Sequence, residues 1–157
     1  MADGIKDKVA IIGMGCTSFG EFWEKSAEDL LVDSFVEAAE DAGVEKKDIQ
    51  AVWCGTHFEE TNVGKGSLAV ARTLKLPFIP VTRTENFCAT GTEALRGAVY
   101  GVAAGVCDIA MAIGVEKLKD TGYGGLPESA NVSMMGTHAR WTGPHRTAPG
   151  SYAMMAT

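Results

Sequence analysis

The sequence lacks a surplus of basic side chains, and this lack excludes one broad class of partners. Its 157 residues include 14 Lys and Arg against 20 Asp and Glu, which gives a formal net charge of -6. A nucleic-acid groove needs clustered Lys and Arg, because these side chains displace counterions from the phosphates. The composition therefore predicts that nucleic acid is not a partner.

Long hydrophobic runs are also missing. The longest nearly apolar stretch, residues 97–107, stops at Asp108 and is shorter than the ~20 residues that a membrane-spanning helix requires. The first eight residues carry four charged side chains, so the chain does not start with the long apolar core of a signal peptide. We therefore expect no membrane segment and a cytoplasmic protein.

The cysteines show none of the close spacings typical of metal or redox sites. Cys16, Cys54, Cys88 and Cys107 are far apart and form no C-x-x-C pair, which argues against a zinc knuckle and a redox motif. Disulfides are not expected in the cytoplasm. The sequence therefore predicts four cysteines without disulfide bonds.

Two further motifs fall short of the sites they suggest. His57 is near Glu59 and Glu60, but a fourth metal ligand is absent, so a solvated loop is the simpler interpretation and no metal site is predicted. Gly13-Met14-Gly15 resembles the start of a dinucleotide-binding glycine motif, but its third glycine is missing. The sequence therefore argues against a Rossmann dehydrogenase.

Short apolar runs alternate with helical patterns along the first 120 residues. The runs at 9–13 and 109–113 are apolar throughout, as in strands buried on both faces of a parallel sheet. Ser26 with Asp29 resembles an N-cap with an acidic residue three positions later. The sequence thus predicts an α/β fold with strands at 9–13, 49–55, 78–83 and 108–116, and helices from Ser26 to Gly43, over 64–75 and over 88–105.

The character of the sequence changes after Lys119. Residues 121–150 show no sustained period, whereas 152–156 resemble the first turn of another helix. The sequence therefore predicts a core over 1–120, with the order βαβαβαβ, and a long irregular loop region over 121–157.

The predicted helix 88–105 has an unusual composition. It carries two charged residues and should be buried nearly all round. Gly97, Gly101 and Gly105 repeat every four residues, although an interior glycine costs about 0.5–1 kcal/mol relative to alanine. Close packing on a neighbouring element would offset this cost, and that neighbour could belong to a part of the protein outside this chain.

Cys88 is the candidate nucleophile, because it lies where a strand and turn lead into that helix. The first helical turn presents N–H groups and about half a positive charge, which favours thiolate over thiol and can receive an oxyanion. The small residues Ala89 and Gly91 leave space for an acyl group. Position alone leaves a second interpretation open, in which Cys88 is a small buried apolar residue.

The region 85–120 resembles the nucleophile region of thiolases, and the resemblance extends over the whole chain. It is closest to thiolases of the archaeal and sterol-carrier-protein type. Further similar segments are found at 9–13, 17–20 and 152–156. The matching residues are Cys88-Ala89-Thr90-Gly91, Ala94-Leu95 and Gly114-Val115-Glu116-Lys117.

This resemblance implies the N-terminal half of a five-layered αβαβα fold, in which 121–157 begins a loop domain that covers the active site. It implies that Cys88 accepts an acyl group from acyl-CoA for Claisen condensation or thiolysis. The substrates would be acyl-CoA and coenzyme A, with no tightly bound cofactor. It also implies a homodimer or tetramer that pairs through strand 78–83, and a zinc-ribbon/OB-fold partner protein.

Two catalytic groups of complete thiolases are not found in these 157 residues. They are the histidine of a Gly-His-Pro motif and the cysteine of a Cys-x-Gly motif. Gly143-Pro144-His145 has the first motif's residue types in another order, so His145 is interpreted as a loop histidine. We therefore expect no turnover of acyl-CoA by this chain alone. A non-catalytic thiolase-like scaffold is the alternative, although a scaffold has no need of Cys88.

Overall fold

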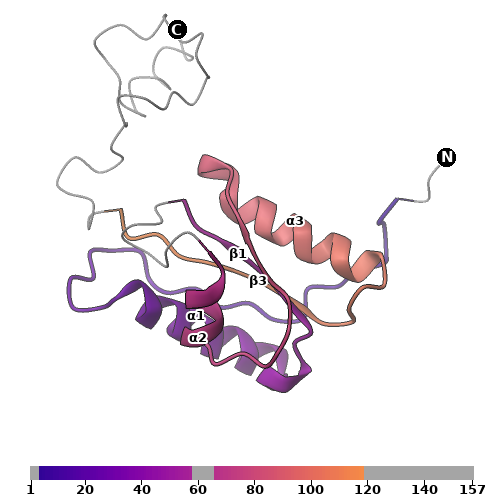
Figure 1. The fold of residues 1–157 in the computed structure, drawn as a ribbon, viewed down its shortest axis with the longest axis horizontal. Helices are drawn as coiled ribbons and strands as arrows, with labels where there is room; N and C mark the ends of the chain where they lie inside the picture. Colours follow the sequence, from indigo (N-terminus) through magenta and orange to yellow (C-terminus); the bar gives the residue numbers. More distant parts are fainter. Residues whose placement is uncertain (1–3, 58–65, 119–157) are drawn as a thin grey trace, which may run out of the picture. The chain divides into compact units, whose positions relative to one another are not determined.

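The computed structural model describes residues 4–57 and 66–118. All of the elements belong to one unit, Met1–Lys117. Figure 1 shows their arrangement. In chain order they are helix α1 (Ala27–Ala42), 3-10 turn η1 (Lys46–Asp48), strand β1 (Ala51–Gly55), helix α2 (Leu68–Thr73), strand β2 (Val81–Thr84), 3-10 turn η2 (Phe87–Ala89), helix α3 (Thr90–Ala103) and strand β3 (Ala110–Gly114).

The three strands form one parallel sheet in the order β2-β1-β3. Val52 in the central strand β1 is in register with Val81 of β2 and Met111 of β3. Helices α2 and α3 connect successive strands, as parallel pairing requires. The predicted α/β class is therefore confirmed, and each predicted strand and helix that appears is shorter than its sequence pattern suggested.

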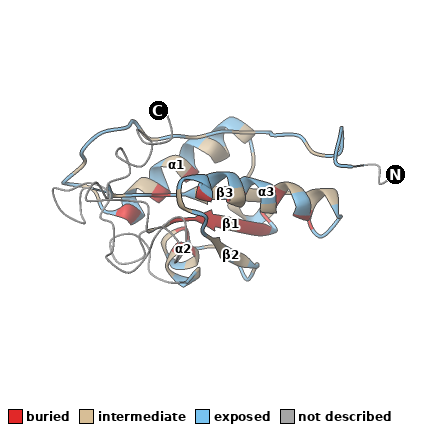
Figure 2. Cartoon of the chain, turned by 90° about the horizontal axis from the view of Figure 1, so that it is seen from above, coloured by how far each residue is buried: buried red, intermediate tan, exposed pale blue. Residues whose placement is uncertain are grey.

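Alternate side chains of β1 pack on opposite faces of the sheet. Val52 and Cys54 belong to the core cluster that also contains Leu31 of α1 and Val70 of α2. Trp53, between them, packs against α3. Figure 1 shows α3 on one side of the sheet and α1 and α2 on the other, and Figure 2 shows β1 as a largely buried strand, in which Trp53 alone is half-buried. This three-layer arrangement is what sets α3 over the sheet.

The predicted N-cap of α1 is confirmed. Ser26 Oγ accepts a hydrogen bond from the Asp29 backbone N–H at 3.1 Å, and the Asp29 carboxylate accepts one from Ser26 N–H at 2.8 Å. The helix ends at Gly43, whose φ of 65° is readily adopted by glycine. Local sequence signals thus fix both ends of this helix.

The predicted first strand at 9–13 is wrong. These residues belong to no strand, and Ile11 and Ile12 are 74 % and 54 % exposed. An apolar β-branched run favours extended backbone, but ladder formation also requires a neighbouring strand, which the local pattern cannot specify. Among the described residues, no strand pairs with this run.

The segment directly after residues 9–13 is held by helix α1 and not by a strand. The backbone N–H groups of Met14 and Cys16 donate to the carboxylates of Asp41 and Glu37 at 2.9 and 2.8 Å. A Cβ added to Gly13 would lie 2.6 Å from a backbone carbonyl oxygen of α1, so only glycine permits this approach. The glycines of this segment, which resembles the start of a dinucleotide-binding motif, therefore serve packing against the helix.

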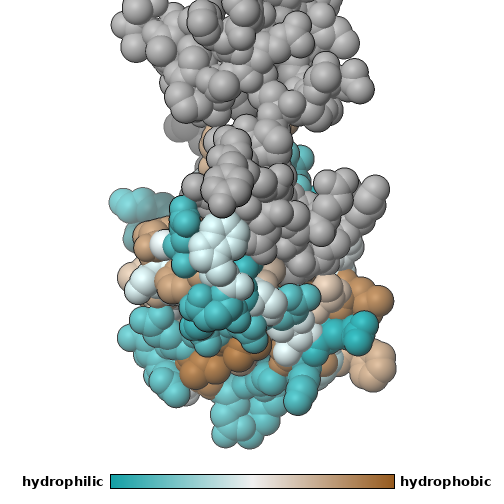
Figure 3. All heavy atoms as spheres, turned by 90° about the vertical axis from the view of Figure 1, so that its left-hand side faces the viewer, coloured by the Kyte–Doolittle hydropathy of each residue, from teal (hydrophilic) through white to brown (hydrophobic). Residues whose placement is uncertain are grey.

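Two expectations of burial are also wrong. Helix α3 is not buried all round, because Leu95 and Tyr100 are 44 % and 54 % exposed. Strand β3, expected to be buried on both faces, lies at one edge of the sheet in the described residues, with Met111 and Ile113 only half-buried. Figure 3 shows brown apolar side chains among teal polar ones on the described surface. Composition reports how apolar an element is, but it does not report what covers it.

The neighbour that packs closely on Gly97 and Gly101 of helix α3 is Trp53 of β1, which belongs to this chain. A Cβ added to Gly97 would lie 2.4 Å from Trp53 Cδ1, and one added to Gly101 would lie 2.6 Å from Trp53 Cη2. Gly105 has a different role, since its φ of 71° ends the helix in left-handed backbone. Two of the three glycines thus admit the indole, and the third is a C-terminal cap.

The predicted loop region 121–157 lies outside the described residues, as do His138, His145, Glu59 and Glu60. Within residues 4–57 and 66–118, no helix is both long and apolar enough to cross a membrane. In the same part of the chain, no group of three or more His, Cys, Asp or Glu side chains is arranged to hold a metal ion.

Candidate active site

Cys88 lies in η2, the 3-10 turn between the end of β2 and the start of α3. The predicted helix began at residue 88, but the α-helix begins at Thr90, so Cys88 precedes its first turn. The residue is exposed. An exposed cysteine is therefore presented at the carboxyl end of the sheet, directly before a helix N-terminus.

The turn that carries Cys88 has an unusual backbone. Phe87 has a φ of 46°, a left-handed value that costs about 1–2 kcal/mol for a residue with a Cβ. Two bonds close the turn around it: Ala89 N–H donates to the Asn86 carbonyl oxygen at 2.9 Å, and Asn86 N–H donates to Thr90 Oγ1 at 2.8 Å. The strained residue thus immediately precedes the cysteine.

The carboxylate of Glu85 contacts this turn directly. Its Oε1 accepts a hydrogen bond from Phe87 N–H at 2.6 Å and lies 3.0 Å from His57 Nδ1. The His57 and Phe87 rings also pack together, with centroids 4.9 Å apart and planes at 41°. The Phe87 N–H bond, and to a lesser degree His57, holds the pKa of Glu85 below its ordinary value. Glu85 is therefore held as a carboxylate in contact with the backbone of the turn.

All three strand ends contribute to this cluster. His57 follows β1, and its backbone N–H donates to the carboxylate of Glu116, which follows β3. Arg83 of β2 donates from Nη2 to the Thr56 and His57 carbonyl oxygens at 2.8 and 3.5 Å. The interpretation of His57 as a solvated loop residue was therefore incomplete, because its ring is tied to Glu85.

Close backbone packing sets the start of α3 against the sheet. A Cβ added to Gly55, at the end of β1, would lie 3.0 Å from the Thr90 carbonyl oxygen. One added to Gly114, at the end of β3, would lie 2.7 Å from the Gly55 carbonyl oxygen. The absence of a side chain at Gly55 lets the helix that follows Cys88 approach the sheet closely, and its absence at Gly114 lets the ends of β1 and β3 lie close together.

The other cysteines differ from Cys88. Cys54 is fully buried, and burial raises the pKa of its thiol to about 11. Burial also raises the pKa of Cys107. Cys16 is exposed, but it lies in the segment held along α1, with its N–H bonded to the Glu37 carboxylate. Cys88 is therefore the exposed thiol that directly precedes a helix N-terminus.

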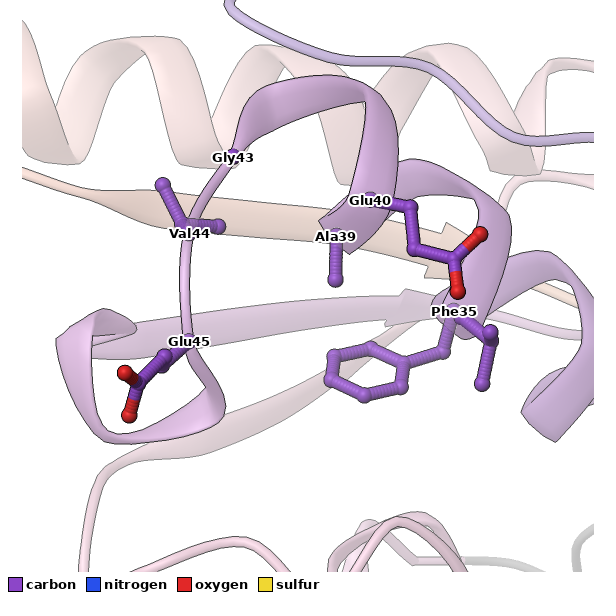
Figure 4. A pocket seen from close by; sticks show the side chains of 7 residues that line it. Phe35, Ala39, Glu40, Gly43, Val44 and Glu45 are labelled. Atoms are coloured by element: carbon purple, nitrogen blue, oxygen red, sulfur yellow. The ribbon is translucent and has the colours of Figure 1, made fainter.

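A hollow of about 340 Å³ lies at the C-terminal end of α1, as Figure 4 shows. Phe35, Ala39 and Val44 line it, and no residue of η2 or α3 takes part. It holds no nucleophilic side chain. This hollow is therefore separate from the candidate site around Cys88.

The profile of the family described as "Thiolase, N-terminal domain" matches residues 9–140. The chain belongs to the thiolase family. It is 39% identical over 151 residues to an acetyl-CoA acetyltransferase of Methanocaldococcus jannaschii, and the match covers 94% of this chain and 37% of that protein. This thiolase chain therefore spans little more than a third of the length of that relative.

Solved structures show the same fold. The acetyl-CoA acetyltransferase of Syntrophomonas wolfei matches 76% of this chain and 33% of its own, with a TM-score of 0.55 and 20% identity. The Ltp2-ChsH2(DUF35) aldolase matches 62% of this chain and 25% of its own, with a TM-score of 0.52 and 23% identity. Both likenesses support a thiolase-like fold for the described α/β unit.

The lowered pKa of Glu85 leads to a pH prediction. A carboxyl whose folded pKa lies below its unfolded value, 4.5, contributes stability above that value and loses it as the pH falls through the folded pKa. The free energy of unfolding of the wild type should therefore exceed that of Glu85→Gln near pH 7, and the difference should shrink as the pH falls below 4.5 and through the lowered folded pKa. Urea unfolding followed by tryptophan fluorescence measures this difference. Glu24→Gln, at an exposed position, is the control, and a Glu85 difference that grows on acidification contradicts the assignment.

Proposed function

We propose that this chain is the acyl-accepting half of a thiolase, with Cys88 as the catalytic nucleophile. The observation that carries the proposal is the exposed Cys88 in the turn between β2 and α3, within the match to the thiolase family. The N–H groups of the following helical turn can stabilise the oxyanion formed when a thiolate adds to a thioester.

The proposed reaction is acyl transfer through an acyl-cysteine. The Cys88 sulfur attacks the thioester carbonyl of acyl-CoA, forming a new C–S bond as the old one breaks, and coenzyme A leaves and takes up a proton. The acyl group then passes to an enolate in Claisen condensation, or to coenzyme A in thiolysis. Turnover requires proton-transfer groups that the family resemblance assigns to the second half of a thiolase, so coenzyme A esters are proposed as substrates of the complete protein.

Assembly is part of the proposal. In the described residues, β2 is an edge strand of the sheet, and the nearby Phe78 is fully exposed. An exposed strand edge with an aromatic beside it fits the homodimer or tetramer that the resemblance implies. The name of the solved aldolase includes DUF35, which supports the proposal of a zinc-ribbon/OB-fold partner. The four cysteines form no disulfide, which is compatible with a cytoplasmic protein.

Trapping the acyl-enzyme tests the function. The chain is incubated with radiolabelled acetyl-CoA at pH ~8.5, where thiols ionise without help from a base, and is then quenched in acid and mapped by peptide mass spectrometry. We expect one acetyl group on Cys88, sensitive to hydroxylamine, with no labelling of Cys88→Ala and normal labelling of Cys16→Ala. A folded chain that takes up no acetyl group, or takes it up equally without Cys88, contradicts the proposal and favours the scaffold.

A further inference from the structure

A phenylalanine with left-handed backbone directly before the nucleophile needs something to hold it there. Phe87 has a φ of 46°, and its apolar side chain cannot hydrogen-bond its own backbone, as Asn or Asp can. Released from its contacts, this residue would return to a right-handed or extended conformation. Because Cys88 is the next residue, such a change would redirect the thiol.

We propose that Glu85 is the positioning residue for Cys88, acting as a clamp that holds Phe87 in the conformation that presents the thiol. This inference rests on the proposed function, in which Cys88 is the nucleophile. The clamp consists of Glu85 and His57, and it contacts Phe87 at two places. The Glu85 carboxylate binds the Phe87 N–H at 2.6 Å, and the His57 ring packs on the Phe87 ring with centroids 4.9 Å apart.

One oxygen joins the two parts of the clamp. Glu85 Oε1 accepts from Phe87 N–H and also lies 3.0 Å from His57 Nδ1. Hydrogen bonds to a charged acceptor are about twice as strong as neutral ones. The two side chains are 34% and 30% exposed, so water reaches the clamp only in part.

The clamp is anchored to the ends of all three strands. His57 is held through its backbone N–H by Glu116 after β3, and through its carbonyl oxygen by Arg83 of β2. Glu85 directly follows β2. The conformation of the Cys88 turn is therefore coupled to the sheet by side chains as well as by the chain itself. Within residues 4–57 and 66–118, charged side chains that contact His57 include Glu85, Glu116 and Arg83.

The test measures the alkylation rate of Cys88 relative to that of Cys16 in the same molecule. The chain is treated with iodoacetamide at pH 8, and both cysteines are quantified by peptide mass spectrometry. Glu85→Ala removes the acceptor, so it should slow Cys88 relative to Cys16 by about tenfold or more, the effect expected on losing a hydrogen bond to a charged group. Glu85→Gln keeps an oxygen acceptor and should stay within about threefold of wild type.

A second background separates positioning from a merely structural role. Glycine adopts left-handed backbone without strain, so Phe87→Gly no longer needs the clamp. In that background, Glu85→Ala should change the Cys88 rate by less than about threefold. A structural residue that acted elsewhere would slow Cys88 equally in both backgrounds.

Circular dichroism establishes that each variant is folded. If Glu85→Ala alone fails to fold, the Glu85→Ala/Phe87→Gly variant should still fold and label like Phe87→Gly, and a double variant that also unfolds overturns the clamp. Folded Glu85→Ala that labels Cys88 at the wild-type rate overturns it as well. In wild type, Cys88 that labels no faster than Cys16 would count against the nucleophile itself, which is a separate failure of the proposed function.

Discussion

In the native chain, iodoacetamide at pH 8 should modify Cys88 first and leave Cys54 and Cys107 essentially unmodified. Cys54 is fully buried with a thiol pKa of about 11, so only about one thiol in a thousand is ionised at that pH, even before access is considered. Cys54 should therefore react at least about 10²-fold more slowly than Cys88. Cys16 is exposed as well, but no helix N-terminus follows it to stabilise developing negative charge, so it should rank second.

Peptide mapping over time, with intact-mass counting of the alkyl groups, gives the order directly. The control is the same reaction in guanidinium chloride, where the rates of the four cysteines should converge because burial and helix geometry are lost. Native labelling of Cys54 at the rate of Cys88 would contradict the described core, since it requires frequent opening around β1.

Gly97→Ala should lower the free energy of unfolding by about 1–3 kcal/mol, although alanine is the better helix former. The added methyl group would lie 2.4 Å from Trp53 Cδ1, so the indole or the helix must move. Gly91→Ala adds the same methyl group to the same helix, but apart from the backbone of its own helix and its chain neighbours nothing in the structure lies within 4 Å of it. That control should be neutral or stabilising by up to about 1 kcal/mol.

Urea unfolding of both variants compares their free energies of unfolding. Repeating Gly97→Ala in a Trp53→Leu background completes a double-mutant cycle. In the Trp53→Leu background, where the side chain is smaller, Gly97→Ala should cost much less, because the methyl group no longer meets the indole. Equal costs in the two backgrounds would show that the glycine is required for another reason.

Features determined by nearby residues could be predicted from the sequence. The start of α1 follows from Ser26 and Asp29, and its end follows from Gly43, so both were predicted where they occur. The alternation of strands and helices after residue 49 also follows from local periodicity, and it led to the confirmed α/β class. The position of Cys88 before α3 followed from the same pattern.

Features that depend on a distant partner could not be predicted. The run at 9–13 has the composition of a strand, but α1 holds the segment that follows it. The contact between Glu85 and His57 joins residues 28 apart in the sequence, and no local motif links them. A hint was present at Phe87, a bulky residue directly before a candidate nucleophile, but its positive φ appears only in the structure.

The parallel order β2-β1-β3 also has a consequence for synthesis on the ribosome. Val52 is followed by about 30 residues before its partner Val81 and by about 60 before Met111, so β1 leaves the exit tunnel long before either neighbour. At about 5–20 residues per second, the face of β1 that carries Trp53 waits several seconds for α3, whereas α1 is already available for the opposite face. During that interval, one edge of β1 and the Trp53 side chain lack their native neighbours, which β3 and α3 supply when they emerge.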